Sequence, residues 1–145
     1  MKKYLRPLLS ILFSAVFLFE TPAQNFWQKT NGPFGGNVKS LAITLSGDIL
    51  AGTDVDGAYR STDNGDNWTQ INFSPNFCSF AINSNGHIFA ITEFTGTAND
   101  GVYRSTDNGN NWTLINNGLT NTSASSLAIN SNGHIFAGTS IYGTS

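Results

Sequence analysis

Two eight-residue stretches of this chain differ at a single position: Ser61-Thr62-Asp63-Asn64-Gly65-Asp66-Asn67-Trp68, and 44 residues later Ser105-Thr106-Asp107-Asn108-Gly109-Asn110-Asn111-Trp112. The residues before each copy are also similar, Gly-Ala-Tyr-Arg at 57–60 and Gly-Val-Tyr-Arg at 101–104. A shorter unit, Ser-(Leu or Phe)-Ala-Ile, occurs three times and ends at Ile43, Ile82 and Ile129. Such regular self-similarity indicates a protein made of repeated supersecondary units.

Each repeat has the pattern of a four-stranded antiparallel meander. Strand A ends at the Ser-x-Ala-Ile unit, strand B is the apolar run that follows, strand C surrounds Tyr59 or Tyr103, and strand D starts at Trp68 or Trp112. Asn-Gly at 85–86 and 132–133 predicts a two-residue hairpin turn between A and B, in which both central residues have positive φ. A unit of this size is typical of a β-propeller blade, so we expect an all-β, partial β-propeller of four-stranded antiparallel blades.

The repeats also suggest how the chain is divided. Residues 1–23 have a basic start, an apolar run from Leu8 to Phe19 and small residues at 21–23, which is the pattern of a signal peptide. An uncleaved anchor is the alternative, although the apolar run is short for one. We then expect a closing strand D at Trp27 and a linker in 24–37, blade 1 in 38–72, blade 2 in 73–116 and half of a third blade in 117–145.

This division leaves the predicted ring incomplete. Two full blades, half of a third and a closing strand are too few, because propellers have at least four blades. We therefore expect a piece of a longer product, or one part of a multi-chain assembly in which open edges associate with further blades or with other copies. The signal peptide predicts a secreted, periplasmic or cell-surface location, with no membrane insertion after cleavage.

The repeated eight residues have a physical role as a turn between strands C and D. Asp63 and Asp107 can accept hydrogen bonds from unpaired turn amides, with help from Ser61 and Ser105. Glycine supplies a backbone conformation that other residues reach only with strain, and tryptophan fixes the turn on the blade. The predicted structural set is Ser61, Asp63, Gly65, Trp68, Ser105, Asp107, Gly109 and Trp112. A catalytic aspartate is the less favoured reading, and the spacing does not match a calcium-binding EF-hand loop.

Both copies match the pattern Ser-x-Asp-x-Gly-x-x-Trp, and in this they resemble the Asp-box, or BNR, repeat. Proteins with such repeats include bacterial sialidases, xyloglucan-cleaving hydrolases, sortilin-type receptors and photosystem II assembly factors. The resemblance covers nearly all of 27–145 and implies a propeller in which the box serves structure, away from any active centre. The repeated sequence Tyr-Arg-Ser-Thr-Asp-Asn-Gly is most similar to that of secreted multi-repeat bacterial proteins.

Candidate binding residues lie in the loops between strands B and C. In a meander these loops are opposite the Asp-box end, and they differ between the copies, as expected of binding loops on a rigid scaffold. The acidic candidates are Asp54, Asp56, Glu93 and Asp100. Paired carboxylates there would suit glycoside hydrolysis, but solvated loop residues are the simpler interpretation. A sialidase site would need three arginines, whereas Arg60 and Arg104 occupy one repeat position in separate blades.

These observations favour a recognition or scaffold module, with a protein or a glycan on the variable-loop face and no catalytic centre of its own. The alternatives are a fragment of a glycoside hydrolase whose catalytic carboxylates lie in other blades, and an assembly factor for a membrane complex. Residues 24–145 contain four basic and eight acidic residues and no cluster of basic residues, so we expect no nucleic-acid partner. His87 and His134 occupy one repeat position without other ligands, so neither a metal site nor a cofactor is expected.

Overall fold

The computed structural model describes residues 28–34, 36–73, 77–92 and 94–140, and within them every regular element is a β-strand. The signal-peptide prediction for 1–23 and the strand predicted at Trp27 lie outside these residues, and residues 28–34 form no strand. The ten strands are β1 (Val38–Ile43), β2 (Ile49–Thr53), β3 (Ala58–Ser61), β4 (Thr69–Gln70), β5 (Phe77–Ile82), β6 (Ile88–Thr92), β7 (Val102–Ser105), β8 (Thr113–Leu114), β9 (Ala124–Ile129) and β10 (Ile135–Thr139).

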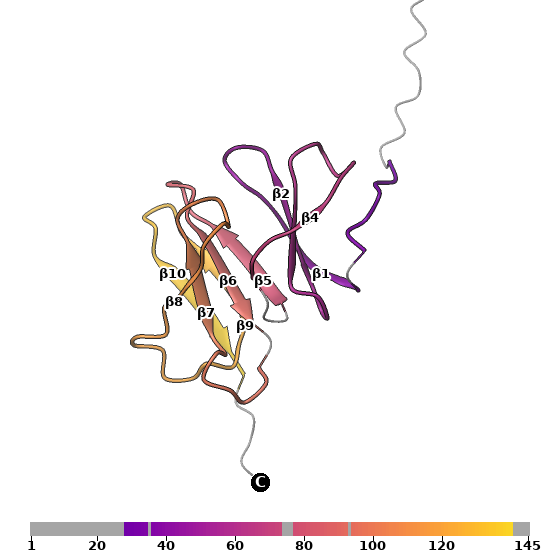
Figure 1. Ribbon diagram of the computed structural model, residues 1–145. Helices are drawn as coiled ribbons and strands as arrows, with labels where there is room; N and C mark the ends of the chain where they lie inside the picture. Colours follow the sequence, from indigo (N-terminus) through magenta and orange to yellow (C-terminus); the bar gives the residue numbers. More distant parts are fainter. Residues whose placement is uncertain (1–27, 35, 74–76, 93, 141–145) are drawn as a thin grey trace, which may run out of the picture.

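The strands form three antiparallel sheets in chain order. Strands β1–β4 make one four-stranded meander, β5–β8 make a second, and β9 and β10 pair as a hairpin (Figure 1). The two four-stranded sheets have the same register, since Ala42 pairs with Leu50 in the first and Ala81 with Phe89 in the second. The prediction of an all-β chain with four-stranded antiparallel units is therefore confirmed, and the 44-residue repeat corresponds to one sheet.

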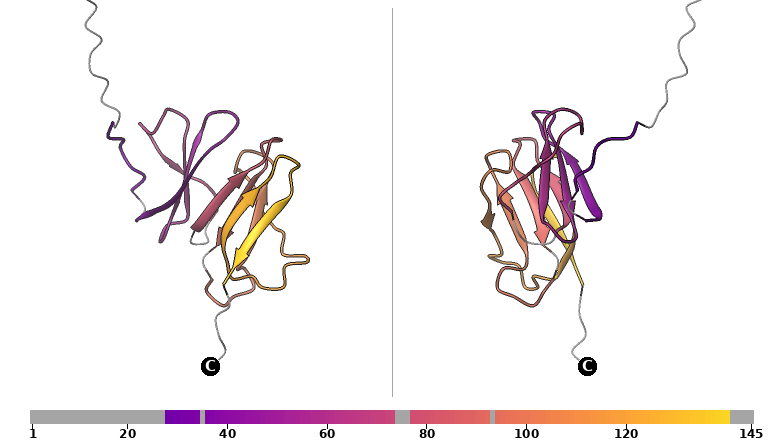
Figure 2. Two further views of the ribbon diagram at one scale, coloured as in Figure 1. Left: turned by 180° about the vertical axis from the view of Figure 1, so that it is seen from behind. Right: turned by 45° about the vertical axis from the view of Figure 1, so that its right-hand side comes forward.

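The sheets are stacked through their first strands. Strand β1 contacts β5, and β5 contacts β9, so the first strands of the three sheets lie next to one another. The view from behind shows β9 between β5 and β10 (Figure 2). The fourth strands, β4 and β8, have two residues each and, among the described residues, pair with the third strands alone. This arrangement directs the turns of all three sheets toward shared ends.

Apolar side chains fill the space between the sheets. Leu50 and Ala58 of the first sheet are fully buried and belong to one cluster with Phe80, Ile88 and Ala90 of the second. A second cluster joins the other face of the second sheet to the hairpin; it consists of Ile91, Val102 and Ala124, with Leu127 and Ala137 packed against them. Both faces of β6 are thus covered, and all five of its residues are buried. This explains its continuous apolar sequence.

The turns between the first and second strands differ from the prediction. Asn85 and Asn132 do not have positive φ, whereas Gly86 and Gly133 have φ of 79° and 80°. The Gly86 amide donates to the Asn83 carbonyl over 3.0 Å, and the Asn83 amide donates to the His87 carbonyl over 3.1 Å. The prediction of a two-residue turn with two positive φ values is wrong. A single left-handed glycine closes a three-residue loop, which is the next most common hairpin geometry.

No helix that could span a bilayer is present in the described part of the chain.

Candidate functional site

The turn between β3 and β4 contains the first copy of the repeated Ser-x-Asp-x-Gly-x-x-Trp sequence, which we call an Asp box for its sequence pattern alone. This turn is held by its own serine and aspartate. Ser61 is buried, and its Oγ accepts a hydrogen bond from the Gly65 amide over 2.8 Å while donating to Asp63 Oδ1 over 2.9 Å. The carboxylate of Asp63 then accepts from the Asn67 amide (2.8 Å) and from Asn67 Nδ2 (2.7 Å). The side chains therefore supply the acceptors that the turn amides lack in the strand ladder.

The second Asp-box turn, between β7 and β8, repeats this geometry. Ser105 Oγ accepts from the Gly109 amide over 2.9 Å and donates to Asp107 Oδ1 over 2.8 Å. Asp107 accepts from the backbone and side-chain amides of Asn111 over 2.8 and 2.7 Å. In both turns the indole of the tryptophan donates to the glycine carbonyl over 3.0 Å, from Trp68 to Gly65 and from Trp112 to Gly109.

The Asn-Gly pairs of these turns have the left-handed backbone that was predicted for the other hairpins. Asn64 and Asn108 have φ of 58° and 59°, and Gly65 and Gly109 have φ of 93° and 85°. Asparagine tolerates this region better than most residues. The geometry that Asn-Gly favours thus occurs at the Asp boxes, where side-chain hydrogen bonds hold the backbone in place.

The Asp-box carboxylates are stabilised in their charged form. Hydrogen bonds from Asn67, followed by that from Ser61, lower the pKa of Asp63. The equivalent bonds from Asn111 and Ser105 lower the pKa of Asp107 to about 2. A general acid needs the opposite shift, toward neutral pH. The boxes therefore have the electrostatics of fixed hydrogen-bond acceptors.

The second Asp box also connects the two four-stranded sheets. Asn108 Nδ2 donates to Asp48 Oδ2 over 2.7 Å, and the Arg60 guanidinium donates to the Asn108 carbonyl over 2.9 Å and to Asn110 Oδ1 over 3.2 Å. Asp48 lies in the β1–β2 turn, so the two kinds of turn meet at one end of the sheets. Arg60 thus joins neighbouring sheets, a role that sequence reasoning missed. Arg104 is exposed.

At the opposite end, the β2–β3 loop contains two of the predicted acidic residues. Asp54 accepts from the Asn37 amide (2.8 Å) and from Asn37 Nδ2 (2.9 Å), and it forms an ion pair with Lys39 at 3.5 Å. The hydrogen bonds from Asn37 lower the pKa of Asp54, and Lys39 adds to the effect. Asp56 is exposed and contributes its carbonyl to Gln70 Nε2 over 2.7 Å. Asp54 therefore ties the segment before β1 to this loop.

Asp100 organises the equivalent β6–β7 loop from within. Its side chain is 3% exposed and accepts from the amides of Thr95 and Thr97 over 3.0 and 2.9 Å, and from their hydroxyls over 2.8 and 3.2 Å. Burial raises its pKa, but these hydrogen bonds outweigh burial and leave the pKa below the ordinary value. Both carboxylate oxygens are occupied by residues of the same loop, so Asp100 has the contacts of a structural residue. Glu93, the fourth acidic candidate, lies outside the described residues.

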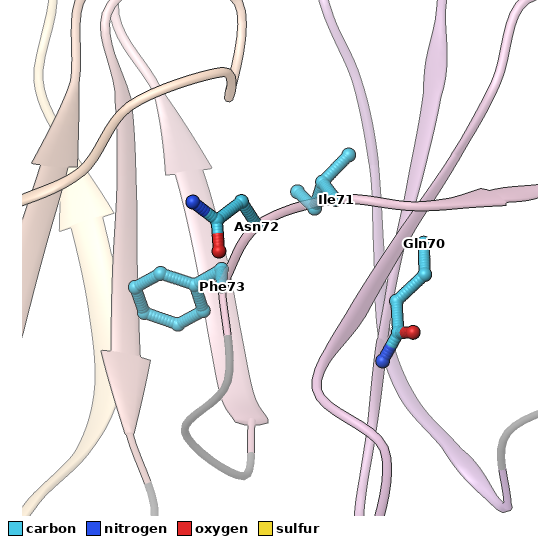
Figure 3. A pocket seen from close by; sticks show the side chains of 4 residues that line it. All are labelled: Gln70, Ile71, Asn72 and Phe73. Carbon is cyan, nitrogen blue, oxygen red and sulfur yellow. The ribbon is translucent and has the colours of Figure 1, made fainter.

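A shallow pocket of about 310 Å³ lies beside the β2–β3 loop. It is lined by Gln70, Ile71, Asn72 and Phe73, where the chain passes from the first sheet to the second (Figure 3). Phe73 is 4% exposed, with its ring centroid 4.9 Å from that of Tyr103 and 4.6 Å from that of Trp112. The Phe73 ring packs between the first and second sheets. Asn72 is exposed at the pocket.

The described residues bring together no group of three or more histidine, cysteine, aspartate or glutamate side chains. His87 and His134 lie in the β5–β6 and β9–β10 turns of two different sheets. The carboxylates of Asp54 and Asp100 both accept hydrogen bonds from neighbouring residues, Asp54 from Asn37 and Asp100 from its own loop. At this end of the sheets, Asp56, Gln70 and Asn72 offer hydrogen-bonding groups and charge. Beside them, Val55 is 66% exposed and offers apolar surface.

No protein family, curated protein or solved structure matches this chain. The resemblance to Asp-box proteins rests on the two motifs and on their spacing.

Proposed function

We propose that the chain contributes blades to an exported β-propeller made of Asp-box repeats, and that it acts as a recognition or scaffold module for a protein or a surface glycan. The proposed contact surface is the loop end, defined as the β2–β3 loop (54–57), the described part of the β6–β7 loop (94–101) and the adjoining pocket. The Asp-box end maintains the fold.

The propeller is supported by how the sheets are stacked. Adjacent sheets contact through their first strands, β1, β5 and β9, while the short fourth strands lie farthest from them in strand order. Radial stacking of four-stranded meanders around a central axis is the defining arrangement of a propeller. The equal register of the two complete sheets supports the same interpretation, since each blade then presents the same faces to its neighbours.

One observation supports the recognition role most. The turns at one end of the two sheets are alike, whereas the loops at the other end differ between the sheets. The two Asp-box turns have matching hydrogen bonds at nearly equal lengths. The β2–β3 loop has three residues between Thr53 and Gly57, whereas the β6–β7 loop has eight between Thr92 and Gly101 and is built around Asp100. Loops that vary on a constant scaffold are where binding specificity usually lies.

A hydrolytic role has weaker support among these residues. Asp100 accepts four hydrogen bonds from its own loop, and its pKa is lowered. A carboxyl that must release and take up a proton during catalysis needs a raised pKa and access to its substrate. The loop-end carboxylates therefore suit ligand contact better than acid–base catalysis.

Binding of the purified chain to a glycan array and to proteins extracted from the cell surface tests the proposal. The loop-end variant is Val55→Ala with Asp56→Ala, and the matched control is Asp66→Ala, an exposed aspartate at the Asp-box end. We expect the loop-end variant to weaken binding at least about tenfold, since contact energy concentrates in few residues, and the control to bind normally. Binding lost in the control and kept in the loop-end variant would contradict the proposal, as would no binding to either set.

A further inference from the structure

In the part of the chain that the structure describes, the sheets at the two ends of the stack each leave one apolar face exposed. We call the surface of Leu41 and Ile43 on β1 the front face, and the surface of Phe136 on β10 with Ala128 on β9 the back face. The three large side chains are 64%, 69% and 57% exposed. Exposed apolar surface of this kind marks contact sites.

The front face has the residue positions that are buried inside the stack. Leu41 pairs with Ala51 as Phe80 pairs with Ala90, and Ile43 pairs with Ile49 as Ile82 pairs with Ile88. Phe80, the counterpart of Leu41, is only 9% exposed because the first sheet covers it. The front face is therefore equivalent to a surface that already receives a sheet within this chain.

The back face is equivalent to the face of the first sheet that packs on the second sheet. Phe136 pairs with Ala128 as Leu50 pairs with Ala42 and as Phe89 pairs with Ala81. Leu50 and Phe89 are 0% and 3% exposed, and Leu50 packs in one cluster with Phe80. On the hairpin, Ala137 is packed against the second sheet. Because neighbouring strand residues alternate between faces, Phe136 is directed away from that sheet.

The segment before β1 adds a second, independent sign of an approaching sheet. A Cβ built on Gly65 would lie 2.8 Å from Thr30 Cγ2, and one built on Gly109 would lie 3.6 Å from Ile71 Cδ1. The Asn31 amide also donates to the Gly65 carbonyl over 3.3 Å. Gly65 and Gly109 are equivalent glycines of the two Asp boxes. Thr30 therefore occupies, beside the first Asp box, the place that Ile71 occupies beside the second. Ile71 directly follows β4, the fourth strand of the first sheet, and the first sheet covers the second. Residues 28–34 therefore lie where the segment after the fourth strand of a further sheet, covering the first, would lie.

We infer that the back face of one copy of this chain docks on the front face of a second copy. The contact continues the row of first strands, with β9 of one copy beside β1 of the next, and it repeats the packing of the first sheet on the second. Since two different surfaces meet, the association is head-to-tail, and it either closes into a ring or extends. The inference concerns the faces of the sheets and is independent of what the loop end binds.

Analytical ultracentrifugation of the full chain tests the contact with three samples. Wild type is expected to form concentration-dependent dimers or larger species. Leu41→Asp and Phe136→Asp are each expected to weaken self-association at least about thirtyfold, because each buries an unpaired carboxylate in an apolar contact. Both residues are largely exposed in the single chain, so these substitutions spare the fold, which far-UV circular dichroism checks. Thr106→Asp, at an exposed turn residue outside both faces and outside the loop end, is the matched control and should associate like wild type.

Mixing the two variants distinguishes head-to-tail docking from the alternatives. Leu41→Asp keeps an intact back face and Phe136→Asp keeps an intact front face, so an equimolar mixture should form a one-to-one dimer and nothing larger. A monomeric wild type, variants that associate like wild type, or a mixture that stays monomeric would overturn the inference. Association through residues 1–23 would show as assembly insensitive to both variants. A failure of the loop-end binding test leaves these results unchanged.

Discussion

Replacing Ser105 by alanine isolates the part of the Asp box that is most deeply buried. Ser105 is 1% exposed, and its hydroxyl accepts from the Gly109 amide over 2.9 Å and donates to Asp107 over 2.8 Å. Alanine fits the space but leaves the buried Gly109 amide without an acceptor. We therefore expect Ser105→Ala to destabilise the chain and to leave the overall fold intact.

The magnitude follows from that unpaired amide. A buried donor that loses its partner costs about 1–3 kcal/mol. For a domain of this size, such a loss corresponds to a drop in Tm of roughly 4–12 °C. Ser61→Ala removes the equivalent bond in the first sheet, at 2.8 Å from the Gly65 amide. The two turns share no partner, so the double variant should lose the sum of the single effects within about 0.5 kcal/mol.

Urea denaturation followed by circular dichroism measures these differences. Thr106→Ala is the matched control, since Thr106 is exposed in the same turn and surface substitutions usually change stability by less than about 0.5 kcal/mol. If Ser105→Ala unfolds at the same urea concentration as Thr106→Ala, the argument that side-chain acceptors hold the Asp-box turn is refuted.

Three further predictions concern the carboxylates and the packing between sheets. Because Asp107 has a folded pKa of about 2 against an ordinary 3.8, its stabilising effect is fully present above pH 4 and is lost as the pH falls toward 2; urea midpoints across this range should fall less steeply in Asp107→Asn. Phe73→Ala should cost about 3–5 kcal/mol, as for other buried phenylalanines, whereas Phe34→Ala, at a side chain 92% exposed, should leave the urea midpoint unchanged. Asp100→Ala should speed amide hydrogen exchange in residues 94–99, and protection equal to wild type would contradict its role in that loop.

The repeat made much of the fold predictable from the sequence. The Ser-x-Ala-Ile units end at Ile43, Ile82 and Ile129, where β1, β5 and β9 end. Tyr59 and Tyr103 lie in the third strands, as expected. These features were accessible because apolar patterning and turn residues recur at a fixed spacing, so one repeat supports the interpretation of the next.

The conformation of the Asn-Gly turns was not predictable from the dipeptide alone. The same two residues have two positive φ values at 64–65 and at 108–109, but only one at 85–86. The difference comes from their surroundings. Ser61 and Ser105 accept hydrogen bonds from the glycine amides at the Asp boxes. In the β5–β6 hairpin, the Asn83 amide donates to the His87 carbonyl, which makes the loop three residues long rather than the predicted two. Hydrogen bonds from outside the dipeptide choose between the turn types.

The candidate site was predictable in its place along the chain but not in its contacts. Sequence reasoning identified Asp54 and Asp100 as loop residues, yet one is bound by Asn37 and the other by Thr95 and Thr97. Arg60 was considered only as a substrate ligand, whereas it donates to the neighbouring sheet at Asn108. These partners are distant in sequence or belong to irregular loops, and no periodic pattern marks them.

The central claim is that the two four-stranded sheets are one stacked unit. Native-state amide hydrogen exchange tests it directly at Ala51 on β2 and Ala90 on β6, both fully buried. The stacked arrangement predicts that the two amides exchange with the same free energy, equal to that of global unfolding. Exchange at β2 with a clearly lower free energy than at β6 would show that the sheets open separately and would contradict the account.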